Sequence, residues 1–527
     1  MQRARAVPRG SRLGRGLARG GAVEVLVTGG NGVLGSPTVV ALLVRGHRVR
    51  IYSRHASESA RQWPAEVSCH DGDINDADAL SRAMDGCQAV IHAAGIISEG
   101  ESGTFQEVNV SGTRTVIGAA ERASVTRVVY VSSLGAERGA SDYHASKRAA
   151  ESTVRQFSRQ WVVLRPGNVY GPGDQVISVL LKMVRVVSVV PSIDGGEHPF
   201  QPIWVEDLAQ ALAASVDLAG LEAQTLELAG PDRTSLNDLA VRLRRLTGRA
   251  APSIPMPGFL AVLGARALTA LGITTPLDGN QIQMMKEGNL LAPGQDALKS
   301  VFGVTPTTLD AGLERLADDT PEQTIDEGVG SLVRRHVWVD IQDSKLSAEA
   351  LFERFRARFG EMTPWHVGVG VEPGSQVEVR YGVTLTMSLP LRGHVQVRVV
   401  ELTATSLTLA TLQGHALAGV VRFRLEELPT SLRFHVEVHD RPASMVDWVA
   451  MSTAGGALQL ATWRSTADSL LEESGGSSPE GVKSESQRLR GAEREQAEAW
   501  AKSLVDARLL KLHEQGVSEA AAAGPRG

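Results

Sequence analysis

Short apolar runs of strand length alternate with stretches of helical length from Val23 onward. The runs are Val23–Thr28, Arg48–Tyr52, Ala89–Ala93 and Arg127–Ser132. Strands that alternate with helices form parallel sheets covered by helices on both faces. The pattern therefore predicts an α/β domain with a doubly wound parallel sheet, which we place at residues 23–325. Proline and glycine interrupt its amphipathic segments from about residue 170 to 325, which is typical of a small substrate cap.

The hydrophobic period becomes two after residue 332. Apolar and polar residues alternate along Val383–Leu389 and along Leu432–Val438, as in antiparallel strands that bury one face. We predict a separate α+β domain with an antiparallel sheet at residues 332–475, its apolar face covered by a helix pair within Met445–Glu473.

Both ends of the chain differ from these domains. Residues 1–22 contain six arginines and no acid, which indicates a disordered Arg-rich extension rather than an organellar transit segment. Residues 476–527 are rich in Ala, Glu, Arg, Lys and Gln without a durable apolar stripe, so we expect a polar helical or disordered tail.

Composition narrows the classes of function. The 527 residues are 43% apolar and 21% charged, which is globular composition. A net charge of −5 gives no basic footprint, so we expect no nucleic-acid partner. Cys69 and Cys87 are too few for a disulfide framework or a cysteine zinc site, so we expect no metal and a reducing, cytoplasmic location. No clean apolar stretch reaches the roughly 20 residues of a spanning helix, while peripheral membrane contact and a homo-oligomer stay open.

A glycine-rich run, Thr28-Gly29-Gly30-Asn31-Gly32-Val33-Leu34-Gly35, joins the first strand to the first helix. A diphosphate must approach the backbone closely and lie at a helix N-terminus. Gly29, Gly32 and Gly35 allow the tight turn, the close approach and the helix–strand contact. Three glycines at this spacing are weak evidence by themselves, but their place between a strand and a helix predicts a Rossmann-like dinucleotide site.

The next strand ends in Ser53-Arg54, where an NAD site usually carries an acid that binds the ribose 2′-hydroxyl. A hydroxyl and a guanidinium suit a 2′-phosphate instead, so we expect NADP(H) to be preferred over NAD(H). A solvated strand-end arginine is the alternative. Further along, Asp73 can accept from the adenine amino group or cap a helix. Ala93-Ala94-Gly95 are small enough for the cofactor to lie across the strand end.

Tyr143 and Lys147 are four residues apart and share one face of a predicted helix. The ammonium can then lower the pKa of the phenol, which lets the phenol exchange a proton near neutral pH. Ser133, at a strand end ten residues upstream, would hold the substrate oxygen. A tyrosine and a lysine at this spacing often form only a surface pair, but here they accompany a predicted dinucleotide loop.

These motifs, in this order, resemble the extended or atypical branch of the short-chain dehydrogenase/reductase superfamily. The resemblance covers residues 23–325 and rests on TGGNGVLG, DGDI, HAAG, NVSGT, YVSS, YHASK and LRPGNVYGPGD. It implies that Tyr143 is the general acid/base, Lys147 its electrostatic partner and Ser133 the ligand of the substrate oxygen. Asn109 is implied to support a proton path on the lysine side. The expected cofactor-binding residues are Gly29, Asn31, Gly32, Val33, Gly35, Ser53, Arg54, Asp73, Ile74, Ala93, Ala94, Gly95, Tyr143, Lys147, Pro166, Gly167 and Val169.

The segments FQPIWVEDLAQAL, LELAGPD and QMMKEGNLL look most like the nucleotide-binding accessory subunit of respiratory complex I and its bacterial relatives. Members of that group often bind NADPH for structure rather than turnover. The short interval between Ser133 and Tyr143 departs from the family and puts sugar-nucleotide substrates in doubt.

The second domain resembles an uncharacterised family fused behind such reductases, for which a helix-grip fold around a lipid-like ligand is one interpretation. Its most distinctive motifs are Thr363-Pro364-Trp365-His366, Gln413-Gly414-His415 and Arg441-Pro442. No residue there suggests a reaction.

Two hypotheses of different classes follow. The first is an NADP(H)-dependent oxidoreductase that acts on a carbonyl or alcohol of a small hydrophobic substrate, such as a lipid or a quinone-like compound. The second is a non-catalytic NADPH-binding protein with a structural, assembly or sensor role. An isomerase or epimerase that retains its cofactor is a third hypothesis.

Overall fold

The computed structural model describes residues 22–100, 102–186, 190–193, 195–250, 252–257, 289–292, 297–364, 367–389, 393–451 and 455–522. The expected N-terminal extension lies outside these ranges apart from Ala22. Most of the QMMKEGNLL segment and the Trp365-His366 motif also lie outside them.

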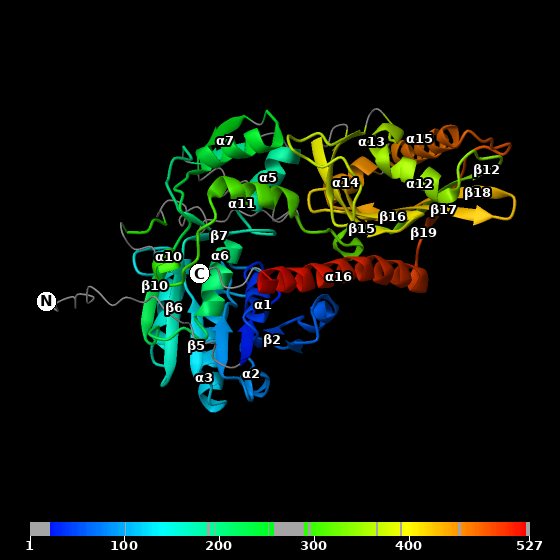
Figure 1. The fold of residues 1–527 in the computed structure, drawn as a ribbon. Coiled ribbons are helices and arrows are strands. Elements are labelled where there is room, and N and C mark those ends of the chain that lie inside the picture. Colours follow the sequence, from blue (N-terminus) through cyan, green and yellow to red (C-terminus); the bar gives the residue numbers. More distant parts are fainter. Residues whose placement is uncertain are drawn as a thin grey trace.

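Seven parallel strands form the sheet of the first domain, in the order β10-β6-β5-β4-β1-β2-β3 (Figure 1). This sheet confirms the predicted doubly wound α/β fold, and the four predicted strands are β1, β2, β4 and β5. The strands are β1 (Glu24–Thr28), β2 (Arg48–Ser53), β3 (Val67–Asp71), β4 (Ala89–His92), β5 (Arg127–Val131), β6 (Gln160–Pro166) and β10 (Gln224–Leu228).

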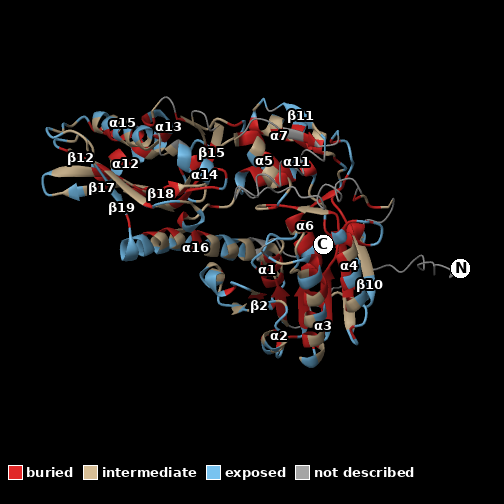
Figure 2. Cartoon of the chain, turned by 180° about the vertical axis from the view of Figure 1, so that it is seen from behind, coloured by how far each residue is buried: buried red, intermediate tan, exposed pale blue. Residues whose placement is uncertain are grey.

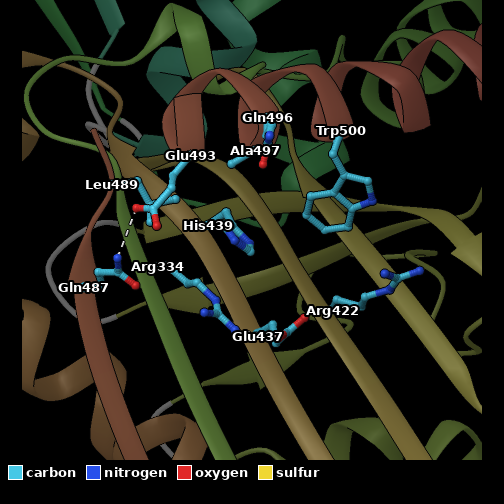
Figure 3. A pocket seen from close by; sticks show the side chains of 10 residues that line it. All are labelled: Arg334, Arg422, Glu437, His439, Gln487, Leu489, Glu493, Gln496, Ala497 and Trp500. Carbon is cyan, nitrogen blue, oxygen red and sulfur yellow. Dashed lines mark hydrogen bonds and ion pairs between the residues drawn. The ribbon is translucent and has the colours of Figure 1, made fainter. Parts of the chain in front are cut away.

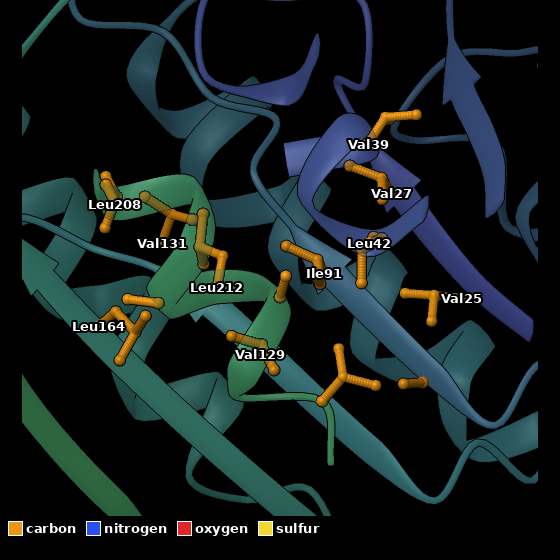
Figure 4. Packing of buried hydrophobic residues seen from close by; sticks show 14 of the residues in the cluster. Val25, Val27, Val39, Leu42, Ile91, Val129, Val131, Leu164, Leu208 and Leu212 are labelled. Carbon is orange, nitrogen blue, oxygen red and sulfur yellow. The ribbon is translucent and has the colours of Figure 1, made fainter. Parts of the chain in front are cut away.

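Helices cover both faces of this sheet because its strands are apolar on both sides. One face packs on α1 (Gly35–Val44) and α6 (Val205–Ala214), in the cluster shown in Figure 4. The other face packs on α2 (Ala77–Met84), α3 (Thr113–Arg122) and α4 (Asp142–Val154). Along β1, Val25 and Val27 belong to the first cluster and Leu26 to the second. This alternation fixes which strand-end side chains face each layer.

The parallel register aligns the carboxyl ends of the central strands. Thr28 of β1 pairs with Tyr52 of β2 and His92 of β4, and His92 pairs with Tyr130 of β5. The loops that follow these strands therefore meet at one edge, where open α/β sheets bind ligands.

The cap lies above this edge and has its own apolar core, which includes Tyr170, Leu180, Trp204 and Leu313. Two short parallel sheets, β7 with β9 and β8 with β11, lie in it. Its elements are β7 (Asn168–Tyr170), α5 (Ile177–Val186), β8 (Val190–Ile193), β9 (Pro202–Trp204), α7 (Leu236–Thr247), β11 (Ser253–Met256), α10 (Ala297–Ser300) and α11 (Leu309–Asp318).

An eight-stranded antiparallel sheet forms the second domain, in the order β13-β14-β15-β16-β17-β18-β12-β19. It confirms the predicted separate domain with an antiparallel sheet. The strands are β12 (Val333–Ile341), β13 (Gly368–Val369), β14 (Thr384–Leu389), β15 (Gly393–Leu402), β16 (Ser406–Thr411), β17 (Leu417–Leu428), β18 (Ser431–Pro442) and β19 (Lys483–Arg488).

One face of this sheet packs on α12 (Ala348–Ala357), α13 (Phe359–Met362) and α15 (Gly456–Ser474) (Figure 2). Phe355 lies at the centre of this cluster, with ring centres 5.2 Å from Phe423 and 5.4 Å from Phe434. The expected helix pair is α14 (Met445–Ala450) and α15. Aromatic side chains thus occupy the space between the sheet and these helices.

The opposite face is also covered, contrary to the expectation of one buried face. Val400, Ala410 and Val420 on this face pack with Ala497 and Ala501 of the long helix α16 (Gly491–Ala522). Small alanines four residues apart provide this contact, and they are too weakly apolar to stand out as a stripe in the sequence. Because β19 also joins the sheet, the second domain extends past residue 475.

Buried ion pairs join the two domains. Arg185 of α5 contacts Glu372 at 2.7 Å, and the two side chains are 6% and 5% exposed. Arg398 of β15 contacts Glu322, which follows α11, at 3.0 Å, and both are buried. Charges removed from water in this way hold their partners in a defined geometry.

Within the described ranges, no helix has the length and apolarity required to cross a bilayer. No cluster of three or more His, Cys, Asp or Glu side chains that could hold a metal ion was found in the same part of the chain.

Candidate active site

The glycine-rich loop between β1 and α1 has the shape that a diphosphate requires. Gly29 has φ of +71°, and a Cβ there would lie 3.0 Å from the Cα of Ala94. At Gly35 a Cβ would lie 2.1 Å from the carbonyl oxygen of Gly29. Among the described residues, no side chain caps the N-terminus of α1. The loop therefore presents a free helix N-terminus beside a close backbone approach, which fits a dinucleotide.

Buried hydrogen bonds connect this loop to the opposite side of the site. Thr113 donates to the carbonyl oxygen of Asn109 at 2.6 Å, so its hydroxyl oxygen accepts from His92 Nε2 at 3.0 Å. His92 Nδ1 then accepts from the Thr28 hydroxyl at 2.8 Å. Burial lowers the pKa of His92 to about 3, so the imidazole is neutral. The Thr28 oxygen also accepts from Ala94 N–H at 3.3 Å, which ties the ends of β1 and β4 together.

The turn after β2 carries Ser53 and Arg54, as the sequence predicts. Asn31 of the glycine-rich loop donates to the Ser53 hydroxyl and to the His55 carbonyl, each at 3.3 Å. Arg54 is exposed and donates to the Ser102 hydroxyl at 3.4 Å. The structure thus brings the guanidinium and the Ser53 hydroxyl to the turn at the end of the strand.

Asp73 and Ile74 follow β3. Asp73 accepts from Asn75 N–H at 2.8 Å within a local turn, whereas Asp76 is the residue that caps α2. Ile74 contacts Gly112, where an added Cβ would lie 2.9 Å from the isoleucine side chain. The adenine contact of Asp73 stays a prediction.

Gly95 brings the loop after β4 against two of the predicted catalytic residues. A Cβ at Gly95 would lie 3.1 Å from Asn109 Oδ1 and 3.2 Å from Lys147 Nζ. The absence of a side chain therefore leaves space in front of the ammonium and the amide. Pro166 and Gly167 end β6 at the same edge, where the Gly167 N–H donates to the Leu228 carbonyl at 2.8 Å. Val33, in the glycine-rich loop, is 38% exposed, and Val169 lies in β7.

Tyr143, Lys147 and Ser133 meet at the start of α4, which Ser141 caps. The Ser133 and Tyr143 side chains form a hydrogen bond. Lys147 Nζ donates to the Val131 carbonyl at 3.0 Å and lies 6.0 Å from the centre of the Tyr143 ring. The structure therefore assembles the predicted trio around one point.

Burial shifts the pKa values of Tyr143 and Lys147, the two titratable members of this trio. It raises the pKa of Tyr143 to about 12, and the hydrogen bond to Ser133 opposes this only in part. Burial also lowers the pKa of Lys147 to about 8. The expectation that the ammonium lowers the pKa of the phenol is therefore not met in the described state, because loss of hydration raises the pKa of Tyr143 and the hydrogen bond with Ser133 is the interaction that opposes it.

Asn109 lies in a π-helical turn, η2 (Gln106–Gly112), and is fully engaged. Its Nδ2 donates to the Ile96 carbonyl and to the Ser146 hydroxyl, each at 3.0 Å, and its Oδ1 accepts from Ile96 N–H at 2.9 Å. Asn109 thus holds the loop after Gly95 against α4.

A buried acid beneath the trio escaped the sequence analysis. Glu151 is 0% exposed and accepts from Arg165 Nε at 2.9 Å and from the Ser132 hydroxyl at 2.5 Å. Burial alone would raise the pKa of Glu151, but the hydrogen bonds from Arg165 and Ser132 bring it below its ordinary value. The signal available in the sequence was the spacing of four residues between Lys147 and Glu151, which places the acid one helical turn from the ammonium.

Fold and site together are similar to those of NAD(P)-binding domains of the extended short-chain dehydrogenase/reductase type. Residues 25–225 match the model of the NAD dependent epimerase/dehydratase family, so the first domain is similar to that family over this range.

Curated relatives agree with this class. A ceramide reductase of Caulobacter vibrioides is 36% identical over 191 residues, which are 36% of this chain and 60% of that protein. A mitochondrial NADH dehydrogenase [ubiquinone] 1 alpha subcomplex subunit 9 of Arabidopsis thaliana is 27% identical over 280 residues, 51% of this chain and 69% of that subunit. Sterol demethylase protein B of Methylococcus capsulatus is 28% identical over 263 residues, 45% of this chain and 78% of that protein. The chain thus spans less than two thirds of the length of the ceramide reductase.

Proposed function

We propose that the protein is an NADP(H)-dependent oxidoreductase that interconverts a carbonyl and an alcohol on a hydrophobic substrate. The observation that carries this proposal is the meeting of Ser133, Tyr143 and Lys147 beside Gly95. The Tyr143 phenol, the Ser133 hydroxyl and the Lys147 ammonium lie there, next to the space that glycine leaves open at position 95.

Each residue of the site has its own role in the proposed reaction. When bound, NADPH supplies the hydride. Tyr143 would give its phenolic proton to the substrate oxygen, which Ser133 holds through the hydroxyl that now pairs with the phenol. Lys147, kept in place by the Val131 carbonyl, stabilises the phenolate that proton transfer leaves behind. Glu151 and Arg165 fix the Ser132–Ser133 turn.

NADP(H) is the cofactor that we propose, rather than NAD(H). Arg54 is exposed at the strand end, and Asn31 fixes the residues on both sides of it. The nearest carboxylate in register, Asp71, is engaged by the Ser57 backbone N–H at 2.8 Å. A guanidinium is well suited to a phosphate, whereas this acid already has a partner.

The hydrophobic class of substrate draws support from the relatives, whose names refer to ceramide and sterol. Exposed apolar side chains on α14 support peripheral membrane contact, which would help to deliver such a substrate. Val446 and Val449 are 63% and 57% exposed there, while Asp447 is turned inward at 4%.

A second candidate is a non-catalytic NADPH-binding protein. Tyr143 and Lys147 are only 7% and 6% exposed, and one relative is named as a subunit of the mitochondrial NADH dehydrogenase. An isomerase or epimerase would in addition retain its cofactor through turnover.

The test is a search for turnover with the full chain and NADPH. Long-chain ketones and 3-ketosteroids should each be offered, and oxidation of NADPH should be followed by absorbance. Turnover that requires Tyr143 supports the oxidoreductase. Tight NADPH binding with no turnover of any of these ketones, together with NADPH binding that Tyr143→Phe leaves unchanged, would support the structural role.

A further inference from the structure

The C-terminal helix α16 runs from the second domain to the first, where it ends beside α1 (Figure 1). Its first half is anchored on the antiparallel sheet. Trp500 lies edge-on to His439, with ring centres 5.4 Å apart, and the Arg422 guanidinium lies 5.4 Å from the Trp500 ring centre. These side chains border a crevice of about 410 Å³ between helix and sheet (Figure 3).

Buried ion pairs hold the middle of α16 in place. Arg508 donates to Glu322 at 3.0 Å, and both side chains are buried. Glu322 also binds Arg398 of the sheet at 3.0 Å. The helix is therefore fixed to the second domain before it reaches the first.

The second half of α16 contacts the first domain at η1 (Ser57–Gln62) and at Trp63, which follows it. The His513 and Trp63 rings stack with centres 4.0 Å apart and planes within 6°. His513 Nδ1 donates to the Gln62 carbonyl at 2.7 Å, and Asp506 accepts from Gln62 Nε2 at 3.0 Å. Trp63 is 6% exposed and belongs to the core of the first domain.

The other side of η1 reaches the proposed cofactor site. Ser59 donates from its hydroxyl to Asn31 Oδ1 at 3.0 Å. Asn31 in turn binds Ser53 and His55, the two neighbours of Arg54. A continuous path of contacts therefore joins His513 to the turn that carries the guanidinium.

We propose that α16 positions the Ser53–His55 turn for the 2′-phosphate of the cofactor through η1, with His513 as the positioning residue. This inference rests on the proposed NADP(H) site. It gives the second domain a part in cofactor selection, because the helix that supports the turn is anchored there. Orientation of the guanidinium matters because a charge-assisted bond to phosphate depends on geometry.

The experiment measures dissociation constants of NADPH and NADH by fluorescence titration of the full chain. His513→Ala should weaken NADPH binding roughly three- to tenfold, the range expected for loss of an aromatic pair, and should leave NADH binding nearly unchanged. His513→Phe keeps a ring that can stack on Trp63, so it should restore most of the NADPH affinity. Leu512→Ala, at a neighbouring position that is 50% exposed, is the matched control and should change neither constant.

Two results would overturn the inference alone. One is a NADPH to NADH ratio in His513→Ala equal to that of the wild type. The other is an equal loss for both cofactors, which would mean that the helix only stabilises the domain. If wild type binds neither dinucleotide, the proposed function fails and this inference fails with it.

Discussion

The ammonium group of Lys147 donates to the backbone carbonyl of Val131 at 3.0 Å. This bond fixes α4 to the end of β5, the strand that leads into the turn carrying Ser133. Helix and strand end therefore hold the lysine, the tyrosine and the serine as one unit. The same contact explains how a buried ammonium is accommodated, since a buried charge needs a hydrogen-bond partner.

Tyr143→Phe should abolish turnover while the fold and NADPH binding persist. The substitution removes only the phenolic hydroxyl, and loss of a general acid costs roughly 10²- to 10⁴-fold in rate. Steady-state rates and NADPH titration check this. Tyr170→Phe is the matched control, because the Tyr170 hydroxyl is buried and finds no hydrogen-bond partner among the described residues. An unchanged turnover rate in Tyr143→Phe would contradict the role of Tyr143 as general acid, on which the enzyme proposal depends.

Arg54→Ala should weaken NADPH binding by about ten- to a hundredfold, the range for a charge-assisted hydrogen bond, and should spare NADH. Titration of both cofactors measures the effect. Arg48→Ala is the control, since Arg48 lies at the opposite end of the same strand and pairs with Glu24 at 2.8 Å. Equal NADPH affinity in wild type and Arg54→Ala would exclude Arg54 from the site.

Stability should rise with pH because of Lys147. Burial lowers its pKa to about 8 in the folded protein, whereas an unfolded lysine titrates near about 10.4. Between these values the unfolded chain binds more protons than the folded one, so the free energy of unfolding increases with pH.

Lys147→Met should therefore be stabilised relative to wild type most strongly below about pH 8, with the difference shrinking toward about pH 10.4. Urea unfolding of both proteins across this range measures the difference, which also cancels other titrating groups. Lys345→Met, an exposed lysine, should give a constant difference. A pH-independent difference for Lys147→Met would show that the lysine is solvated.

The buried pair of Arg185 and Glu372 should contribute strongly to the union of the two domains. Glu372→Gln leaves the Arg185 charge buried with no carboxylate, which costs roughly 3–5 kcal/mol. Urea unfolding checks this, and Arg185→Met/Glu372→Met should be less destabilised than the single variant. The exposed pair of Arg358 and Glu361, at 50% and 66% exposure, should change stability by about 1 kcal/mol or less when broken. Similar losses at both pairs would contradict a buried role.

The sequence by itself determined the parts of the protein that depend on local spacing. Apolar runs that alternate with helical stretches predicted the first sheet, and apolar–polar alternation predicted the second. The positions of Gly29, Gly35, Tyr143 and Lys147 predicted a dinucleotide loop and a catalytic helix. These features follow from backbone geometry within a few residues, because a tight turn needs glycine and a helix face repeats every three to four residues.

Only the tertiary structure decided how distant segments meet. Burial raises the pKa of Tyr143 instead of the lysine lowering it, and burial depends on everything packed around the group. Glu151 meets Arg165 and Ser132 because a helix and two strands converge on one another. His513 stacks on Trp63 across 450 positions of the chain, a contact that no local pattern encodes. The polar C-terminal segment thus becomes a support for the first domain, because long-range packing decides which weakly apolar face is buried.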